Sequence, residues 1–286
     1  MAQWTDGYWW SNDGLRLHYR DYPGRSDRPA IICIPGLTRN ARDFATTADR
    51  LAGEWRLITL NLRGRGESAY AKDPLTYVPL VYLQDIEGLL AELGLDRIIL
   101  FGTSLGGILT MLLGATGHER IAAAMLNDIG PVIENEGLVR IRNNVGRGSS
   151  WPTWIHAARQ LAANHAATYP DYGLEQWLSM AKRLCRLTPQ GRIVYDYDMK
   201  IAEPFRLPGG EAGVDLWPAF ESLKGIPTLL LRGALSDILS DATSREMVRR
   251  HGDLDYVTVP RIGHAPTLDE PEAVAGILRL LARVAG

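Results

Sequence analysis

The stretch Gly102-Thr103-Ser104-Leu105-Gly106 has the pattern Gly-x-Ser-x-Gly, and the fold prediction depends on it. It follows the apolar run Ile98 to Phe101, which is typical of a buried strand, and a helix ending near Gly117 is expected after it. A sharp turn between a strand and a helix projects a serine oxygen above the edge of a sheet, so Ser104 is the candidate nucleophile. The alternative is a glycine-rich turn for packing or phosphate binding, although the Gly-Lys-Ser/Thr ending of a Walker A loop is missing.

Further strands and helices are predicted on both sides of this turn. Gly14 to Tyr19 alternates as an exposed antiparallel strand would, whereas Ala30 to Ile34, Leu57 to Leu60 and Ala122 to Leu126 have the composition of buried strands. A helix that ends at Gly94 is indicated by apolar residues at helical spacing: Leu80, Leu83, Ile86, Leu89, Leu90 and Leu93. Strands that alternate with helices predict a mostly parallel sheet covered by helices.

The alternation stops after Gly130 and resumes with the strand-like run Thr228 to Leu231. The residues between them show helical periodicity, several Trp and Tyr residues, and Pro and Gly breaks. We therefore predict one α/β core domain, residues 1–130 and 221–286, interrupted by a helical cap insertion, residues 131–220.

The composition excludes several classes of protein. Of the 286 residues, 46% are hydrophobic, and the net charge is only −2, which argues against disorder and against a basic surface for nucleic acid. Cys33 and Cys185 are too few for a disulfide framework or a cysteine-based zinc site, and Cys33 lies in an apolar run, as a buried thiol would.

Membrane and targeting segments are not expected either. The first residues lack the basic and apolar regions of a signal peptide. Ile98 to Gly117 carries no charge and is long enough to span a bilayer, but its glycines divide it into a strand and a helix. The sequence thus predicts a cytoplasmic enzyme without a nucleic-acid or membrane partner.

A serine hydroxyl is a weak nucleophile and needs a base. Of the six histidines, His264 follows the last predicted strand, in a loop that should open at the same sheet edge as Ser104. The others are interpreted as structural: His18, His118, His156, His165 and His251. His264 is therefore the predicted base.

A carboxylate should hold the base in the correct tautomer. Asp237 comes just after the penultimate predicted strand, which gives the chain order Ser104, Asp237, His264 that is usual for such a turn. Asp128 ends the strand before the insertion and is the alternative acid, unless it caps the first turn of the insertion. Chain order favours Asp237.

An oxyanion hole needs two backbone donors. The Leu105 N–H group, next to the nucleophile, is the first candidate. The second is the Leu37 N–H group in Pro35-Gly36-Leu37-Thr38, unless that segment is an ordinary turn.

Taken together, these motifs resemble the α/β-hydrolase superfamily, and specifically its capped esterase- and lactonase-like branch. The turn Asn61-Leu62-Arg63-Gly64-Arg65-Gly66-Glu67-Ser68 adds to the resemblance. It implies an α/β-hydrolase fold: a mostly parallel eight-stranded sheet flanked by helices, with an inserted helical cap. Two positions depart from the family pattern, because Pro35 stands where His is usual and Asn61 where Asp is usual.

The predicted function is that of a serine hydrolase that cleaves a carboxylic ester or lactone through an acyl-enzyme, with no metal and no organic cofactor. Relatives with an Asp nucleophile are disfavoured by Ser104, and Ala265 after the histidine differs from the aromatic residue of C–C bond hydrolases. The alternatives are an acyltransferase or perhydrolase, a C–C bond hydrolase on the same triad, and a non-catalytic receptor for a small ligand. The aromatic insertion suggests a small-molecule substrate with apolar surface. Substrate identity and oligomeric state stay open.

Overall fold

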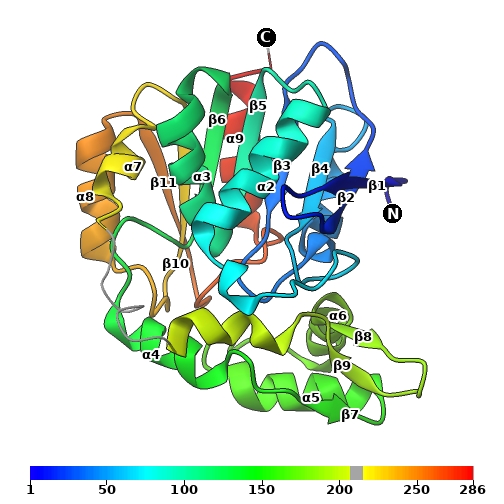
Figure 1. Cartoon of the computed structure of the whole chain (residues 1–286). Helices are drawn as coiled ribbons and strands as arrows, with labels where there is room; N and C mark the ends of the chain where they lie inside the picture. Colours follow the sequence, from blue (N-terminus) through cyan, green and yellow to red (C-terminus); the bar gives the residue numbers. More distant parts are fainter. Residues whose placement is uncertain (207–214, 286) are drawn as a thin grey trace.

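The computed structural model describes residues 1–206 and 215–285. Its centre is an eight-stranded sheet with the order β1-β2-β4-β3-β5-β6-β10-β11 (Figure 1). These strands are β1 (Thr5–Trp10), β2 (Arg16–Tyr22), β3 (Ala30–Ile34), β4 (Leu57–Asn61), β5 (Ile98–Thr103), β6 (Ile121–Asn127), β10 (Thr228–Gly233) and β11 (Leu254–Val259). β1 and β2 are antiparallel to their neighbours and the other pairs are parallel, which confirms the predicted sheet.

The antiparallel end of the sheet differs from the prediction. The sequence patterns did not reveal β1, which pairs with β2 along its length. β2 is therefore an inner strand rather than an exposed one, and His18 on it is only 1% exposed. A short polar segment can be buried in this way when another strand covers its outer side.

Helices cover both faces of the sheet. They are α1 (Ala45–Leu51), α2 (Pro79–Glu92), α3 (Leu105–Gly117), α7 (Trp217–Glu221), α8 (Asp241–His251) and α9 (Pro271–Ala282), with the 3-10 turns η1 (Ala41–Phe44), η2 (Pro74–Thr76) and η3 (His118–Arg120). Alternate strand residues point to opposite faces, so that Ile32 packs in the layer of α2 and α3 whereas Ile31 packs in the layer of α1 and α9. The predicted helix is α2; it buries Ile86, Leu89 and Leu90.

Most of the chain between β6 and α7 forms an insertion beside the carboxyl ends of the parallel strands (Figure 1). Its elements are α4 (Asn135–Asn144), β7 (Ser150–Trp151), α5 (Trp154–His165), α6 (Leu174–Leu184), β8 (Cys185–Leu187), β9 (Ile193–Tyr195) and η4 (Met199–Arg206). The small antiparallel sheet β7-β9-β8 was not predicted. The predicted limit at residue 220 falls inside α7, which packs on α3 because Phe220 belongs to the apolar core. The exact domain limits stay a prediction.

The insertion is tied to the core by buried polar contacts. Arg42 of η1 donates to the carboxylate of Asp196 at 2.7 Å and to the carbonyl of Arg183. The Tyr77 hydroxyl donates to the Asp198 carboxylate, also at 2.7 Å. These contacts hold the insertion over the sheet edge where Ser104 lies. Within the described ranges, none of the helices combines the length and the apolar character that crossing a membrane requires.

Candidate active site

Ser104 stands at the sharp turn between β5 and α3. Its backbone has φ 54° and ψ −116°, which an L-residue rarely adopts. The turn can form only because the flanking glycines lack side chains: a Cβ on Gly106 would lie 2.0 Å from the Ile34 carbonyl oxygen, and one on Gly102 would lie 2.3 Å from that of Gly106. This local strain holds the Ser104 hydroxyl above the sheet edge.

Three side chains from distant parts of the chain form a continuous line of hydrogen bonds at this edge. The Ser104 Oγ atom lies 2.9 Å from His264 Nε2. His264 Nδ1 lies 2.8 Å from the Asp128 Oδ2 atom. His264 follows β11 and Asp128 follows β6, so both reach Ser104 from the carboxyl ends of parallel strands of the same sheet. The arrangement is that of a nucleophile, a base and an orienting carboxylate.

Asp128 is fixed as an acceptor. Its side chain is fully buried, Oδ1 accepts the Gly233 N–H at 2.8 Å, and Oδ2 accepts the Ser236 hydroxyl at 2.6 Å as well as the His264 contact. Hydrogen-bond donors therefore surround the carboxylate and fix its orientation.

The expectation that Asp237 orients the base is wrong for this geometry. Asp237 instead forms a two-pronged ion pair with Arg140 of α4. Burial opposes ionisation of Asp237, but the Arg140 guanidinium holds the pKa of this carboxyl below its usual value. β6 lies directly between β5 and β10, so the strand that ends at Asp128 is next to the strand of Ser104, and Asp237 is one strand further away.

The predicted oxyanion donors lie beside Ser104. Leu105 is the first residue of α3, and Leu37 belongs to a loop that lines the same cavity as Ser104. In the described part of the chain, no backbone acceptor takes either N–H group, so both are available to a ligand.

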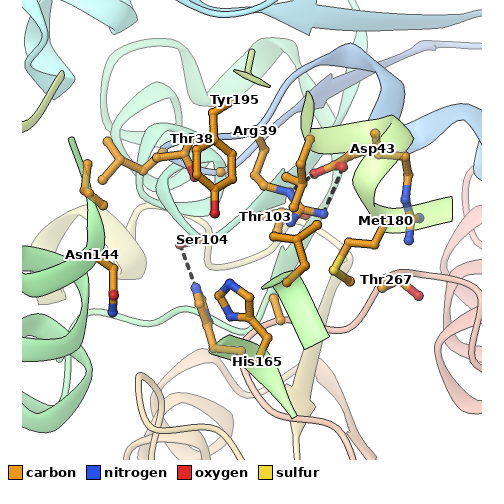
Figure 2. A pocket seen from close by; sticks show the side chains of 18 of the residues that line it. Thr38, Arg39, Asp43, Thr103, Ser104, Asn144, His165, Met180, Tyr195 and Thr267 are labelled. Atoms are coloured by element: carbon orange, nitrogen blue, oxygen red, sulfur yellow. Dashed lines mark hydrogen bonds and ion pairs between the residues drawn. The ribbon is translucent and has the colours of Figure 1, made fainter. Parts of the chain in front are cut away.

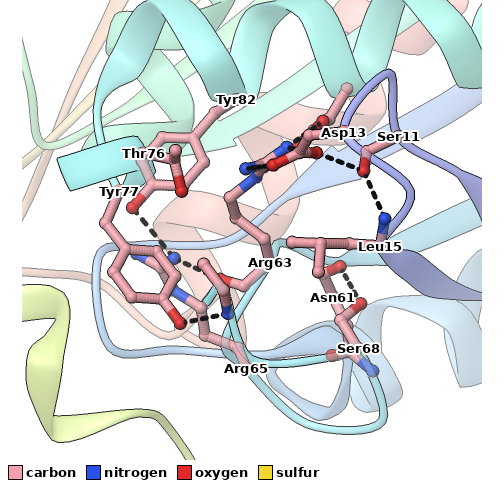
Figure 3. Close-up of polar contacts among 12 residues, drawn as sticks. Ser11, Asp13, Leu15, Asn61, Arg63, Arg65, Ser68, Thr76, Tyr77 and Tyr82 are labelled. Atoms are coloured by element: carbon pink, nitrogen blue, oxygen red, sulfur yellow. Dashed lines mark hydrogen bonds and ion pairs between the residues drawn. The ribbon is translucent and has the colours of Figure 1, made fainter. Parts of the chain in front are cut away.

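A buried arginine supports the Leu37 loop. Arg65 Nε donates to the Leu37 carbonyl at 2.8 Å, while its Nη1 donates to the Tyr82 hydroxyl at 3.0 Å. Its guanidinium lies over the Tyr82 ring, and Tyr77 packs on the other side (Figure 3). Arg65 thereby fixes the backbone next to the Leu37 N–H group.

We expect the Arg65→Met substitution to lower kcat by about 10–100-fold with little change in KM, because a shifted oxyanion donor weakens the transition state more than the bound substrate. Steady-state kinetics on a folded variant measures this split. Arg65→Lys keeps one donor for the Leu37 carbonyl and should recover part of kcat. If both variants instead lowered kcat and raised KM by similar factors, Arg65 would have a purely structural role.

Asn61, which replaces the usual Asp of the turn, has a structural role here. Its side-chain oxygen accepts the Ala41 N–H at 2.7 Å, and its amide nitrogen contacts His18 Nδ1 at 2.8 Å. Both contacts join η1 and β2 to the end of β4, away from the triad.

The triad opens into a cavity of about 410 Å³ between the core and the insertion (Figure 2). From the core it is lined by the Leu37 loop and the loop after His264, and from the insertion by α4, α5, α6 and Tyr195. Apolar walls come from Leu161, Met180 and Leu184. The tryptophans contribute differently: Trp177 packs on Tyr169 and Tyr172 inside the insertion rather than lining the cavity.

His165, interpreted from sequence as structural, instead lines the same cavity as Ser104 (Figure 2). Burial and, to a smaller extent, the positive charges of Arg39 and Arg140 lower its pKa to about 4. Arg39 and Arg140 line the cavity too, and the sequence patterns singled out neither. No local signal could have done so, because only the packing of the insertion on the core brings the three side chains together.

This pKa has a consequence for stability. The pKa of His165 is about 4 in the folded chain, whereas an unfolded chain has the ordinary value of about 6.5. The unfolded state therefore binds a proton more readily, and unfolding becomes more favourable as the pH falls from about 6.5 towards 4. Between pH 7 and 4.5, wild-type protein should therefore lose on the order of 1–3 kcal/mol more unfolding free energy than a His165→Asn variant. Urea unfolding at a series of pH values checks this, with the exposed His156→Asn as control. Parallel pH curves for wild type and His165→Asn would contradict it.

Both cysteines lie in the interior of the protein. Cys33 and Cys185 are buried free thiols, as expected for Cys33, and burial raises the pKa of Cys185 to about 12. Over residues 1–206 and 215–285, no group of three or more His, Cys, Asp or Glu side chains is placed to hold a metal ion.

Comparisons with known proteins agree with this architecture. The model of the Alpha/beta hydrolase family matches residues 31–277. The chain is 33% identical over 270 residues to the 3-hydroxybutyrate-oligomer hydrolase of Cupriavidus necator, covering 91% of this chain and 90% of that protein. It is 32% identical over 261 residues to an sn-1-specific diacylglycerol lipase of Mus musculus, covering 90% and 82%. The crystal structure of an alpha/beta hydrolase from Novosphingobium aromaticivorans superposes with a TM-score of 0.96 at 57% identity, over 99% of this chain and all of that one.

Proposed function

We propose that this chain, which belongs to the alpha/beta hydrolase family, is a serine hydrolase that cleaves a carboxylic ester or lactone through an acyl-enzyme. The observation that carries the proposal is the hydrogen-bonded line from Ser104 through His264 to Asp128 at the floor of a cavity.

In the first half of the reaction, His264 Nε2 takes the proton of the Ser104 hydroxyl as Oγ attacks the carbonyl carbon. The Leu37 and Leu105 N–H groups donate to the oxyanion that forms. Asp128 accepts from His264 Nδ1 and stabilises the imidazolium. His264 then protonates the leaving alkoxide, and the C–O bond breaks.

In the second half, His264 takes a proton from water, and the hydroxide attacks the acyl-enzyme carbonyl. A second oxyanion forms at the same backbone donors. Its collapse returns the proton to Ser104 and releases the carboxylic acid.

The cavity volume favours a small substrate. About 410 Å³ is near the lower end of the range for ligand pockets, so a short ester fits better than a long acyl chain. The name of the Cupriavidus necator relative, a 3-hydroxybutyrate-oligomer hydrolase, points to short esters of a hydroxy acid. We extend that substrate class to this chain as part of the proposal.

Mixing the enzyme with a 4-nitrophenyl ester of a short acid tests the chemistry. We expect a burst of 4-nitrophenol equal to the enzyme concentration and a mass increase of one acyl group on intact protein. Ser104→Ala should show neither. Turnover without a burst or an adduct would argue against an acyl-enzyme, and transfer of the acyl group to an added alcohol in place of water would indicate an acyltransferase.

A further inference from the structure

Four arginines are among the residues that line the cavity beside Ser104, namely Arg39, Arg140, Arg147 and Arg183. Among the lining residues that the structure describes, Asp43 is the one acidic residue. A cleft lined mostly by groups of one sign attracts a substrate of the opposite charge, so this lining favours an anionic substrate group.

Two of these arginines are held in fixed orientations. Arg39 donates through Nε and Nη2 to Asp43, and Arg140 does the same to Asp237. The contacts of the described residues leave Nη1 of each guanidinium without a hydrogen-bond partner. A carboxylate that holds one side of a guanidinium preorganises the remaining N–H groups for a ligand.

Both arginines are close to the reacting atoms. A Cβ added to Gly36 would lie 3.2 Å from Arg39 Cγ and 3.5 Å from Ser104 Cβ, so Arg39 starts directly beside the nucleophile. Arg140 lines the same cavity as Ser104 and His264.

His165 lines the same cavity as these two arginines. The positive charges of Arg39 and Arg140 both act on its ring, although Asp43 and Asp237 pair with them. In the part of the chain that the structure describes, no side chain or carbonyl bonds the His165 ring nitrogens. A neutral imidazole there can donate one N–H to a ligand.

We propose that the ester attacked by Ser104 carries a carboxylate, and that this carboxylate binds at Arg39 Nη1, Arg140 Nη1 and the His165 ring. The inference rests on the proposed function and names its substrate class: a short ester of a hydroxy acid or dicarboxylic acid with one free acid group. A monoanion fits better than a phosphate dianion, because an aspartate already neutralises each of the two guanidinium groups.

The test compares the dimer of 3-hydroxybutyrate with its primary amide, which has the same shape without the charge. Wild type should hydrolyse the acid with a kcat/KM at least about tenfold above that for the amide, since hydrogen bonds to charged groups are the stronger ones. Arg39→Gln and Arg140→Gln should each lower this acid-to-amide ratio by about five- to tenfold.

Two controls show whether a lower acid-to-amide ratio comes from loss of the specific site or only from a change in net charge. Arg39→Gln with Asp43→Asn leaves the net charge unchanged and should lower the ratio as Arg39→Gln does. Arg245→Gln, on the exposed face of α8, should leave the ratio as in wild type. The proposal would be overturned if the acid-to-amide ratio of wild type were near one. It would also be overturned if Arg39→Gln, Arg140→Gln and the double variant all kept the wild-type ratio.

Binding to Ser104→Ala distinguishes failure of the subsite from failure of the proposed function. Calorimetry should give an affinity for the dimer at least about tenfold above that for its amide. If wild type hydrolyses neither compound but this difference in affinity is found, the carboxylate site stands and the ester chemistry is wrong. If wild type hydrolyses both equally and the affinities are equal, the ester chemistry stands and the carboxylate site is wrong.

Discussion

Replacing Ser104 with alanine is expected to lower kcat on a short ester by about 10³-fold or more. The side chain removed is the one whose Oγ lies 2.9 Å from His264 Nε2. Thr38, Thr103, Ser149 and Thr267 also line the cavity, but in the described part of the chain none of their hydroxyls bonds a histidine. No neighbouring oxygen can therefore be activated in its place, and only the oxyanion donors and substrate binding would still accelerate the reaction.

A fluorophosphonate probe locates the nucleophile independently of any substrate. Wild type should take up one equivalent, and peptide mapping should find it on Ser104. Ser104→Ala should take up none, whereas the exposed Ser179→Ala should label like wild type. A label on another serine, or normal turnover by Ser104→Ala, would refute the assignment.

The second large effect is expected from Asp128→Asn, which should lower kcat by on the order of 10²–10⁴ at neutral pH. The Gly233 N–H donates to Oδ1, so the amide oxygen of an asparagine must occupy that position. Its NH₂ group would then face His264 Nδ1, where Oδ2 lies in wild type. The imidazole would have to accept at Nδ1 and carry its proton on Nε2, and this tautomer cannot take the proton of Ser104.

Asp237→Asn is the matched control, because it makes the same chemical change in the carboxylate that pairs with Arg140. On a neutral short ester we expect it to lower kcat less than about tenfold. Thermal unfolding of both variants must first show that they fold, since Asp128 is fully buried. A larger loss for Asp237→Asn than for Asp128→Asn would reverse the assignment of the acid.

The local parts of the site could be predicted from the sequence because their causes are local. A strand, a turn with glycines at Gly102 and Gly106, and a helix follow one another along a few residues, and this is enough to place Ser104 at φ 54°. His264 could be predicted in the same way, as the residue that follows the last strand of a parallel sheet. The order of the core elements likewise follows from periodicity, which depends on neighbours in the sequence.

The choice between Asp128 and Asp237 could not be made in this way. Each carboxylate follows a strand of the same parallel sheet, and chain order favoured the wrong one. Tertiary contacts decide. The Gly233 N–H and the Ser236 hydroxyl hold the Asp128 carboxylate, which contacts His264 Nδ1. Asp237 turns to Arg140 of the insertion instead.

His165 and the arginines of the cavity depend even more on tertiary structure. His165 ends a helix of the insertion, Arg39 follows the Leu37 loop of the core, and Arg140 lies on another helix of the insertion. The sequence by itself predicted the hydrolase core, Ser104 as the proposed nucleophile and His264 as the proposed base. Only the folded chain decided the orienting acid and the charges around the substrate, because side chains that meet through packing leave no periodic or local signal along the sequence.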